Sequence, residues 1–151
     1  EYGISFCQYS YSLPKPLSEF FKLFMQVNYT DFFAALGFTN NPQFSDDTGK
    51  CMVWSEHIFV MLLTHEKFSN FATKPIADTK SDVAGLFSLS VDSVDEVNNI
   101  VTNGLKSGGI EPSEMRDYGF MQQRTIEDFD GHTWEIFYMD MSKFPTEQPA
   151  E

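Results

Sequence analysis

The chain has 151 residues, 42% of them hydrophobic, which is enough for one globular domain with a substantial core. Ten basic residues against twenty-two acidic ones give a formal net charge of −12. This balance argues against nucleic acid and anionic membrane surfaces as partners, because both require a basic face, and leaves a cationic or neutral ligand open.

No apolar run approaches the ~18 residues that a membrane span requires. The two cysteines, Cys7 and Cys51, lie far apart and match no metal-binding spacing. We therefore expect a reduced protein in a cytoplasmic setting.

The first half of the chain is predicted to contain a strand, a short helix and further strands. Residues 20–27 alternate in hydrophobicity, which favours a strand, although a helix is also compatible with them. Asn28 resembles a helix N-cap, and Gly37 ends the helix predicted over residues 29–36. Residues 43–64 are expected to form two or three antiparallel strands.

The second half repeats this order. Residues 86–91 are predicted to form a strand, and Ser93 is a good N-cap for a helix over residues 94–106, whose apolar residues recur on one face. Strands over 119–126 and 132–139 follow. A duplicated βαβββ unit explains this repetition, and two curved half-sheets side by side would leave a concave face uncovered by helices.

The last strand follows a hairpin motif, D-F-D-G-H-T-W-E-I-F, at residues 128–137. Asp can bond its own backbone in a turn, and Gly131 can adopt the positive φ that a tight turn requires. Because side chains alternate along a strand, Glu135 would leave this turn with a fixed facing. The motif thus places one carboxylate on a chosen face of a sheet.

Three segments together resemble the vicinal oxygen chelate superfamily: F-F-A-A-L-G-F (32–38), L-F-S-L-S-V-D-S (86–93) and the hairpin motif. This superfamily includes glyoxalase I, bleomycin-resistance proteins, fosfomycin-resistance enzymes and extradiol dioxygenases. The chain looks most similar to small bacterial glyoxalase-like proteins, often named predicted lactoylglutathione lyases, over about residues 29–141. The resemblance implies an α+β fold with two βαβββ modules forming an open barrel-like cup and the helices outside.

On this basis we expect residues 1–151 to form a single domain. The expected parts are a first module at 18–71, with 1–28 uncertain, a linker at 72–85 and a second module at 86–141.

The resemblance also implies where a metal would bind, because enzymatic members take ligands from the first and last strands of each module. Glu135 matches such a position. Leu86 stands at a second, Met61 or its neighbour Val60 at a third, and the fourth falls near residues 17–19, where Glu19 is the available donor. Aliphatic and thioether side chains do not ligate a hard or borderline divalent ion. We therefore expect the metal site to be incomplete, with no cofactor.

Glu135 has a structural interpretation as well as a catalytic one. If Glu127 pairs with His132 across the turn, Arg124 lies opposite Glu135 and can form an ion pair with it. Such a pair would lower the pKa of the carboxyl group and weaken it as a base. A slip of one residue in the register would remove the contact.

Other polar and aromatic residues are weaker candidates. His57, His65 and His132 lie in separate turns and do not show ligand spacing. One of Gln122 and Gln123 should point inward and would then need a partner or a ligand. Eight residues are candidates for lining the concave face, although core packing is the more common role of the apolar ones: Trp54, Phe59, Met61, Tyr118, Phe120, Met121, Gln123 and Arg124.

The sequence thus predicts a protein of the glyoxalase/bleomycin-resistance type that binds a small organic molecule without a complete metal site. The alternative is a metal-dependent, glyoxalase I-like lyase or isomerase that uses Glu135 with zinc, nickel or manganese. A passive dimer without a ligand is a third hypothesis. By resemblance we expect a homodimer.

Overall fold

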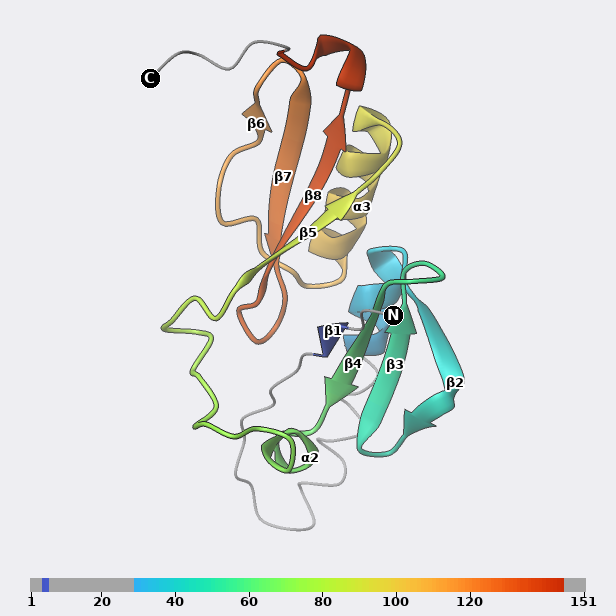
Figure 1. Ribbon diagram of the computed structural model, residues 1–151, viewed down its shortest axis with the longest axis vertical. Helices are drawn as coiled ribbons and strands as arrows, with labels where there is room; N and C mark the ends of the chain where they lie inside the picture. The colour runs from blue at the N-terminus through green and yellow to red at the C-terminus, as the bar shows by residue number, and fades with distance from the viewer. Residues whose placement is uncertain (1–3, 6–28, 146–151) are drawn as a thin grey trace.

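The computed structural model describes residues 4–5 and 29–145 and contains two four-stranded sheets (Figure 1). The strand order is β1-β4-β3-β2 in the first sheet and β5-β8-β7-β6 in the second. In each sheet the first strand runs parallel to the last, and the other neighbours are antiparallel. The expected α+β fold with two βαβββ modules is confirmed, and the two sheets do not close into a barrel.

The first module consists of β1 (Ile4–Ser5), a helical segment at residues 29–35, β2 (Thr39–Asp46), β3 (Gly49–Val53) and β4 (Phe59–Leu63). The predicted helix ends as expected, at Gly37 with φ of 106°. The strand predicted over residues 20–27 lies outside the described residues. The strand that pairs with β4 is β1, which precedes the expected module boundary at residue 18.

The second module consists of β5 (Leu86–Ser90), α3 (Val94–Lys106), β6 (Arg116–Asp117), β7 (Met121–Glu127) and β8 (Thr133–Met139), followed by the short helix η1 (Met141–Lys143). The hydroxyl of Ser93 accepts the backbone N–H of Glu96 at 3.2 Å, so the predicted N-cap of α3 is confirmed. Val97, Ile100 and Val101 form the buried face of α3. In the part of the chain that the structure describes, no helix has the length and apolar character to cross a membrane.

The connection between the modules contains α2 (His65–Ser69) and then passes beside the β7–β8 turn. The hydroxyl of Thr79 donates to the backbone carbonyl of Asp130 at 2.6 Å. A Cβ on Gly131 would lie 2.5 Å from the carbonyl oxygen of Thr79, so only glycine fits there. The connection is therefore tied to the hairpin that carries Glu135.

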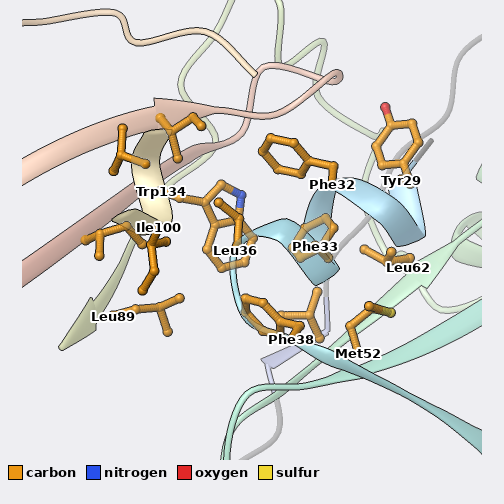
Figure 2. Close-up of a cluster of buried hydrophobic side chains, with 14 of the residues drawn as sticks. Tyr29, Phe32, Phe33, Leu36, Phe38, Met52, Leu62, Leu89, Ile100 and Trp134 are labelled. Carbon is orange, nitrogen blue, oxygen red and sulfur yellow. The ribbon is translucent and has the colours of Figure 1, made fainter. Parts of the chain in front are cut away.

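One cluster of buried side chains spans both modules (Figure 2). Figure 2 shows Phe33 and Leu36 between Trp134 of the second sheet and Leu62 of the first. The rings of Phe33 and Trp134 pack edge to face with centroids 5.3 Å apart. A Cβ on Gly109 would lie 2.7 Å from the ring of Phe32, so a glycine permits this close approach.

Candidate functional site

The β7–β8 hairpin fixes the face on which Glu135 lies. Thr125 is directly opposite Glu135 in the ladder, whereas Arg124 is opposite Ile136. Directly opposed residues share a face and successive residues alternate, so Arg124 and Glu135 point to opposite sides of the sheet. The predicted Arg124–Glu135 pair is therefore wrong.

The geometry of the turn explains this one-residue difference. The backbone N–H of Asp128 donates to the carbonyl of His132 at 3.1 Å, and the N–H of Gly131 donates to the carbonyl of Asp128 at 3.1 Å. His132 therefore belongs to the turn, and the ladder begins with Glu127 opposite Thr133. Every side chain that follows in β8 is displaced by one position from the predicted register.

The carboxylate of Asp128 is buried inside this turn. It accepts the backbone N–H groups of Asp130 and His132, each at 3.0 Å, and the indole N–H of Trp134 at 3.2 Å. Burial raises the pKa of the Asp128 carboxyl group, and the nearby imidazole of His132 opposes this rise. The first part of the hairpin motif therefore orients Trp134 in the core rather than carrying chemistry.

Glu135 is held by two short hydrogen bonds on the side of the second sheet opposite α3, which we call the open face. The hydroxyl of Ser88, directly opposite on β5, donates to Oε2 at 2.6 Å. The side-chain amide of Gln123 donates to Oε1 at 2.6 Å. As expected for one of the two adjacent glutamines, Gln123 faces inward and is only 7% exposed. Both oxygens of Glu135 thus bind uncharged donors.

The open face also presents apolar side chains around this carboxylate. Leu86 and Phe137 lie on the same face of β5 and β8, and Met121 lies on the same face of β7. Leu86 is 59% exposed, although it is aliphatic. A partly apolar surface with one fixed polar centre is typical of small-molecule sites.

Two further polar groups and one cation also lie on the open face. Thr125 is 8% exposed, and no residue in the described ranges forms a hydrogen bond with its hydroxyl. The amide oxygen of Gln123 likewise has no hydrogen-bond partner among the described residues. Arg116 of β6 lies opposite Gln123 on this face and is exposed.

The side chain of Arg124 lies on the other face of β7, which is turned toward α3. Its Nε and Nη2 donate to the two carboxylate oxygens of Glu111 at 2.8 and 2.7 Å, and Nη1 donates to Oδ1 of Asn98 at 3.2 Å. The hydrogen bonds from Arg124 hold the pKa of the Glu111 carboxyl group below its ordinary value. A hollow of about 620 Å³ opens beside this pair, lined by Asn98, Glu111, Pro112, Ser113, Glu114, Met115 and Arg124. This hollow lies on the other side of β7 from Glu135.

The aromatic and methionine candidates are not gathered in one place. Phe59 and Met61 lie on the face of the first sheet opposite the core residues Val60 and Leu62. Trp54 instead packs toward the core against Phe38, with ring centroids 5.2 Å apart. Of the eight predicted lining residues, the structure therefore brings only Met121 and Gln123 onto the open face with Glu135.

Tyr118 and Phe120 lie at the end of the second sheet. Their ring centroids are 6.4 Å apart, and Phe120 packs edge to face on Phe144 at 5.1 Å. The backbone N–H of Tyr118 donates to the carbonyl of Met121 at 2.9 Å, which closes the β6–β7 turn. These two aromatic residues flank the sheet rather than line it.

Two of the metal positions implied by the resemblance hold side chains that do not suit a hard or borderline divalent ion. Met61 and Glu135 are each the third residue of the last strand in their module. A thioether therefore occupies the position that corresponds to the carboxylate, and Leu86 offers no donor atom. Residues 17–19 lie outside the described part. Among residues 4–5 and 29–145, no group of three or more His, Cys, Asp and Glu side chains could hold a metal ion.

The histidines do not supply the missing ligands. His57 is exposed in a bend, His65 is exposed at the start of α2, and His132 is buried in the hairpin, with its ring centroid 6.2 Å from that of Phe87. Sequence reasoning missed Ser88 and Thr125 as members of the Glu135 cluster. The alternation in L-F-S-L-S already places Ser88 on one face with Leu86, but its partner depends on the parallel β5–β8 register.

No family profile matches the chain, and no curated protein matches it. Several solved structures do. A hypothetical protein from S. aureus is 20% identical with a TM-score of 0.63, over 74% of this chain and 84% of that one. A glyoxalase/bleomycin resistance protein/dioxygenase family enzyme from Burkholderia phytofirmans is 12% identical with a TM-score of 0.62, over 91% and 96%.

A member of the same superfamily from Sphaerobacter thermophilus is 16% identical with a TM-score of 0.53, over 91% of this chain and 97% of that one. Identities this low establish shared architecture rather than shared activity. The resemblance to lactoylglutathione lyases in particular stays a prediction. The chain has the fold of the glyoxalase/bleomycin-resistance/dioxygenase superfamily.

Proposed function

We propose that this protein binds a small, partly apolar organic molecule on the open face of its second sheet and does so without a complete metal site. The centre of the proposed site is Glu135, and Met121 and Gln123 belong to its surroundings. Phe59 and Met61 would contribute only if the first sheet of the same or another copy faces this surface.

One observation carries the proposal: both oxygens of Glu135 are bound by the neutral donors Ser88 and Gln123. A carboxylate that ligates a metal needs its oxygens directed at the ion, together with further donor residues. Here the side chains at two of the other implied positions, Leu86 and Met61, lack suitable donors. The carboxylate is instead fixed as an acceptor beside the apolar side chains of Leu86 and Phe137.

The second candidate is a metal-dependent lyase or isomerase of the glyoxalase type. Glu135 favours it, because this carboxylate occupies the implied ligand position on the last strand and faces the open side of the sheet. In that case Zn²⁺, Ni²⁺ or Mn²⁺ would have to displace Ser88 and Gln123 from the carboxylate.

Metal content and turnover separate the two candidates. The purified protein is incubated with each of the three ions, desalted, and assayed for bound metal and for conversion of a hemithioacetal. We expect substoichiometric metal and no turnover, with Glu135→Gln behaving like Glu114→Gln, an exposed control away from the open face. One tightly bound ion per chain, with turnover lost only in Glu135→Gln, would establish the enzyme instead.

A thermal-shift screen tests the binding proposal directly. A ligand that binds only the folded state raises the melting temperature in proportion to its occupancy. We expect some partly apolar compounds to stabilise the wild type and to lose their effect in Glu135→Gln. If no compound in the library raises the melting temperature, the hypothesis of a passive dimer without a ligand is favoured instead.

The proposal includes a homodimer, a single domain over residues 1–151 and a cytoplasmic setting. Exposed apolar side chains such as Leu86 and Val83 support a further contact surface, and the free, buried thiol of Cys51 is compatible with a reducing compartment. Light scattering at working concentration tests the dimer, which a monomeric mass would exclude.

A further inference from the structure

We infer that the open face selects an organic cation that carries N–H donors, such as a primary ammonium or an amidinium, over neutral and anionic molecules of the same shape. The inference rests on the proposed function, because it assigns a ligand class to the same site. It depends on a count of the hydrogen-bonding groups around Glu135.

The polar groups that remain available near Glu135 are mostly acceptors. The single hydroxyl hydrogen of Ser88 and one amide hydrogen of Gln123 are used by Glu135. A serine hydroxyl has two acceptor lone pairs, and an ionised carboxylate accepts about four hydrogen bonds. Ser88 and Glu135 therefore retain acceptor capacity, while one N–H of Gln123 and the hydroxyl hydrogen of Thr125 remain as donors.

Two further side chains on the open face add acceptor oxygens to this set. Gln123 and Thr125 are 7% and 8% exposed. The amide oxygen of Gln123 and the hydroxyl of Thr125 have no hydrogen-bond partner among the described residues. Among the described residues neither of these oxygens is fully enclosed, so each can accept a hydrogen bond from a molecule on the open face. A ligand rich in donors would satisfy both groups together with Glu135.

The charges around Glu135 also favour a cationic ligand. Neutral donors orient the carboxylate of Glu135 but leave its charge uncompensated. Glu127 lies farther along β7 on the same face and adds a second negative charge. Arg116, on β6, is the opposing cation; it is exposed, and a charge in water is strongly screened. The net charge of −12 further favours the approach of a cation.

The apolar part of such a ligand would lie against Leu86, Met121 and Phe137. These side chains flank the polar centre on β5, β7 and β8. A molecule with one cationic end and a compact apolar body therefore fits better than a polyamine, which would leave this surface uncovered.

Three probes of similar shape test the inference: benzylammonium, benzyl alcohol and benzoate. Each is titrated into ¹⁵N-labelled protein at neutral pH while amide shifts on β5, β7 and β8 are followed. We expect benzylammonium to bind at least about tenfold more tightly than benzyl alcohol, a difference of about 1.4 kcal/mol. Benzoate should not shift these resonances.

Variants assign the preference to specific groups. Glu135→Gln should remove most of the preference for benzylammonium, and Ser88→Ala should weaken it a few-fold. Arg116→Gln changes an exposed side chain with no hydrogen bond or ion pair to the described residues, so the fold is kept, and binding of benzylammonium should tighten. This variant keeps the inference testable even if Glu135→Gln fails to fold.

The outcomes distinguish this inference from the proposed function. If benzyl alcohol or benzoate binds on the same strands as tightly as benzylammonium, the ligand class assigned here is wrong, while a small-molecule site remains. If none of the three probes shifts any resonance of the open face, both the ligand class and the binding proposal for this face are contradicted.

Discussion

Gln123 and Arg124 are neighbours in β7, yet their side chains end in two different networks on opposite sides of the sheet. Gln123 donates to Glu135 on the open face, and Arg124 binds Glu111 and Asn98 on the side of α3. The Arg124–Glu111 ion pair thus fixes β7 on the side of α3, while Gln123 on the open face of the same strand binds the carboxylate of Glu135. Stability and ligand binding can therefore be tested separately on adjacent residues.

Replacing Arg124 with methionine should reduce the free energy of unfolding by about 2 kcal/mol, because two hydrogen bonds to a charged partner are lost in a largely buried position. The matched control is Lys143→Met, which removes the ion pair with Asp140 from a side chain that is 67% exposed. That control should cost less than about 1 kcal/mol. Urea denaturation of both variants measures the difference, and equal losses would show that the Arg124 pair is not special.

The contribution of the Arg124–Glu111 pair should depend on pH. Arg124 lowers the folded-state pKa of Glu111 below its ordinary value of 4.5. A lowered carboxyl pKa gives stability that is present above the unfolded-state value and is lost as pH falls through the folded-state value. The difference in unfolding free energy between wild type and Arg124→Met should therefore be constant near neutral pH and shrink below about pH 4.5.

Urea titrations at several pH values check this dependence. Asp128 has a raised pKa and contributes with the opposite sign, but it is present in both proteins and cancels in the difference. A difference that stays the same down to about pH 3 would mean that packing, rather than charge, accounts for the effect of the substitution.

Asp128→Ala should be more harmful than Asp128→Asn. The alanine variant leaves the indole N–H of Trp134 and two backbone N–H groups without their acceptor in a buried turn, at a cost of about 3 kcal/mol. Asparagine retains one acceptor oxygen and should lose less. Denaturation gives the energies, and the indole N–H resonance of Trp134 reports the lost bond. An unchanged resonance in Asp128→Ala would contradict the assigned contact.

Gly131→Ala and Gly119→Ala form a matched pair that tests the tie between the linker and the hairpin. Both glycines have positive φ, 88° and 79°, so alanine is strained by about 1–2 kcal/mol at either position. A Cβ on Gly119 meets no atom within 4 Å, whereas on Gly131 it would lie 2.5 Å from the carbonyl oxygen of Thr79. Gly131→Ala should therefore be the more destabilising variant by a further 1–3 kcal/mol, about the cost of overpacking. Equal melting temperatures of the two variants would show that the linker at Thr79 moves away from the added methyl group without a measurable cost.

Much of the second module could be predicted from the sequence because its signals are local. Ser93 and Glu96 mark the start of α3, and Val97, Ile100 and Val101 define its buried face. The Asp and Gly residues of the hairpin motif identify the turn. These signals act within a few residues of the chain, so the local structure they predict does not depend on tertiary contacts.

The features that the sequence did not reveal depend on contacts between residues that are distant in the chain. Strand β1 pairs in parallel with β4, and nothing in its own sequence indicates that partner. The facing of Arg124 depended on whether His132 belongs to the turn or to the strand, which a count from Gly131 does not settle. Ser88 was overlooked because its bond to Glu135 joins two neighbouring strands that are separated in sequence by α3, β6 and β7. The alternation of residues along a strand predicts which face a side chain lies on, but only the register between strands determines its partner on the next strand.

In both modules the opening strand lies beside the closing one, β1 against β4 and β5 against β8. Neither parallel ladder can form until nearly the whole module has been brought together, which carries a large loop-closure entropy. High contact order of this kind slows folding. The hydrogen bond between Ser88 and Glu135 joins β5 to β8 in one of these parallel ladders. We therefore expect it to form at the end of folding rather than in the folding nucleus.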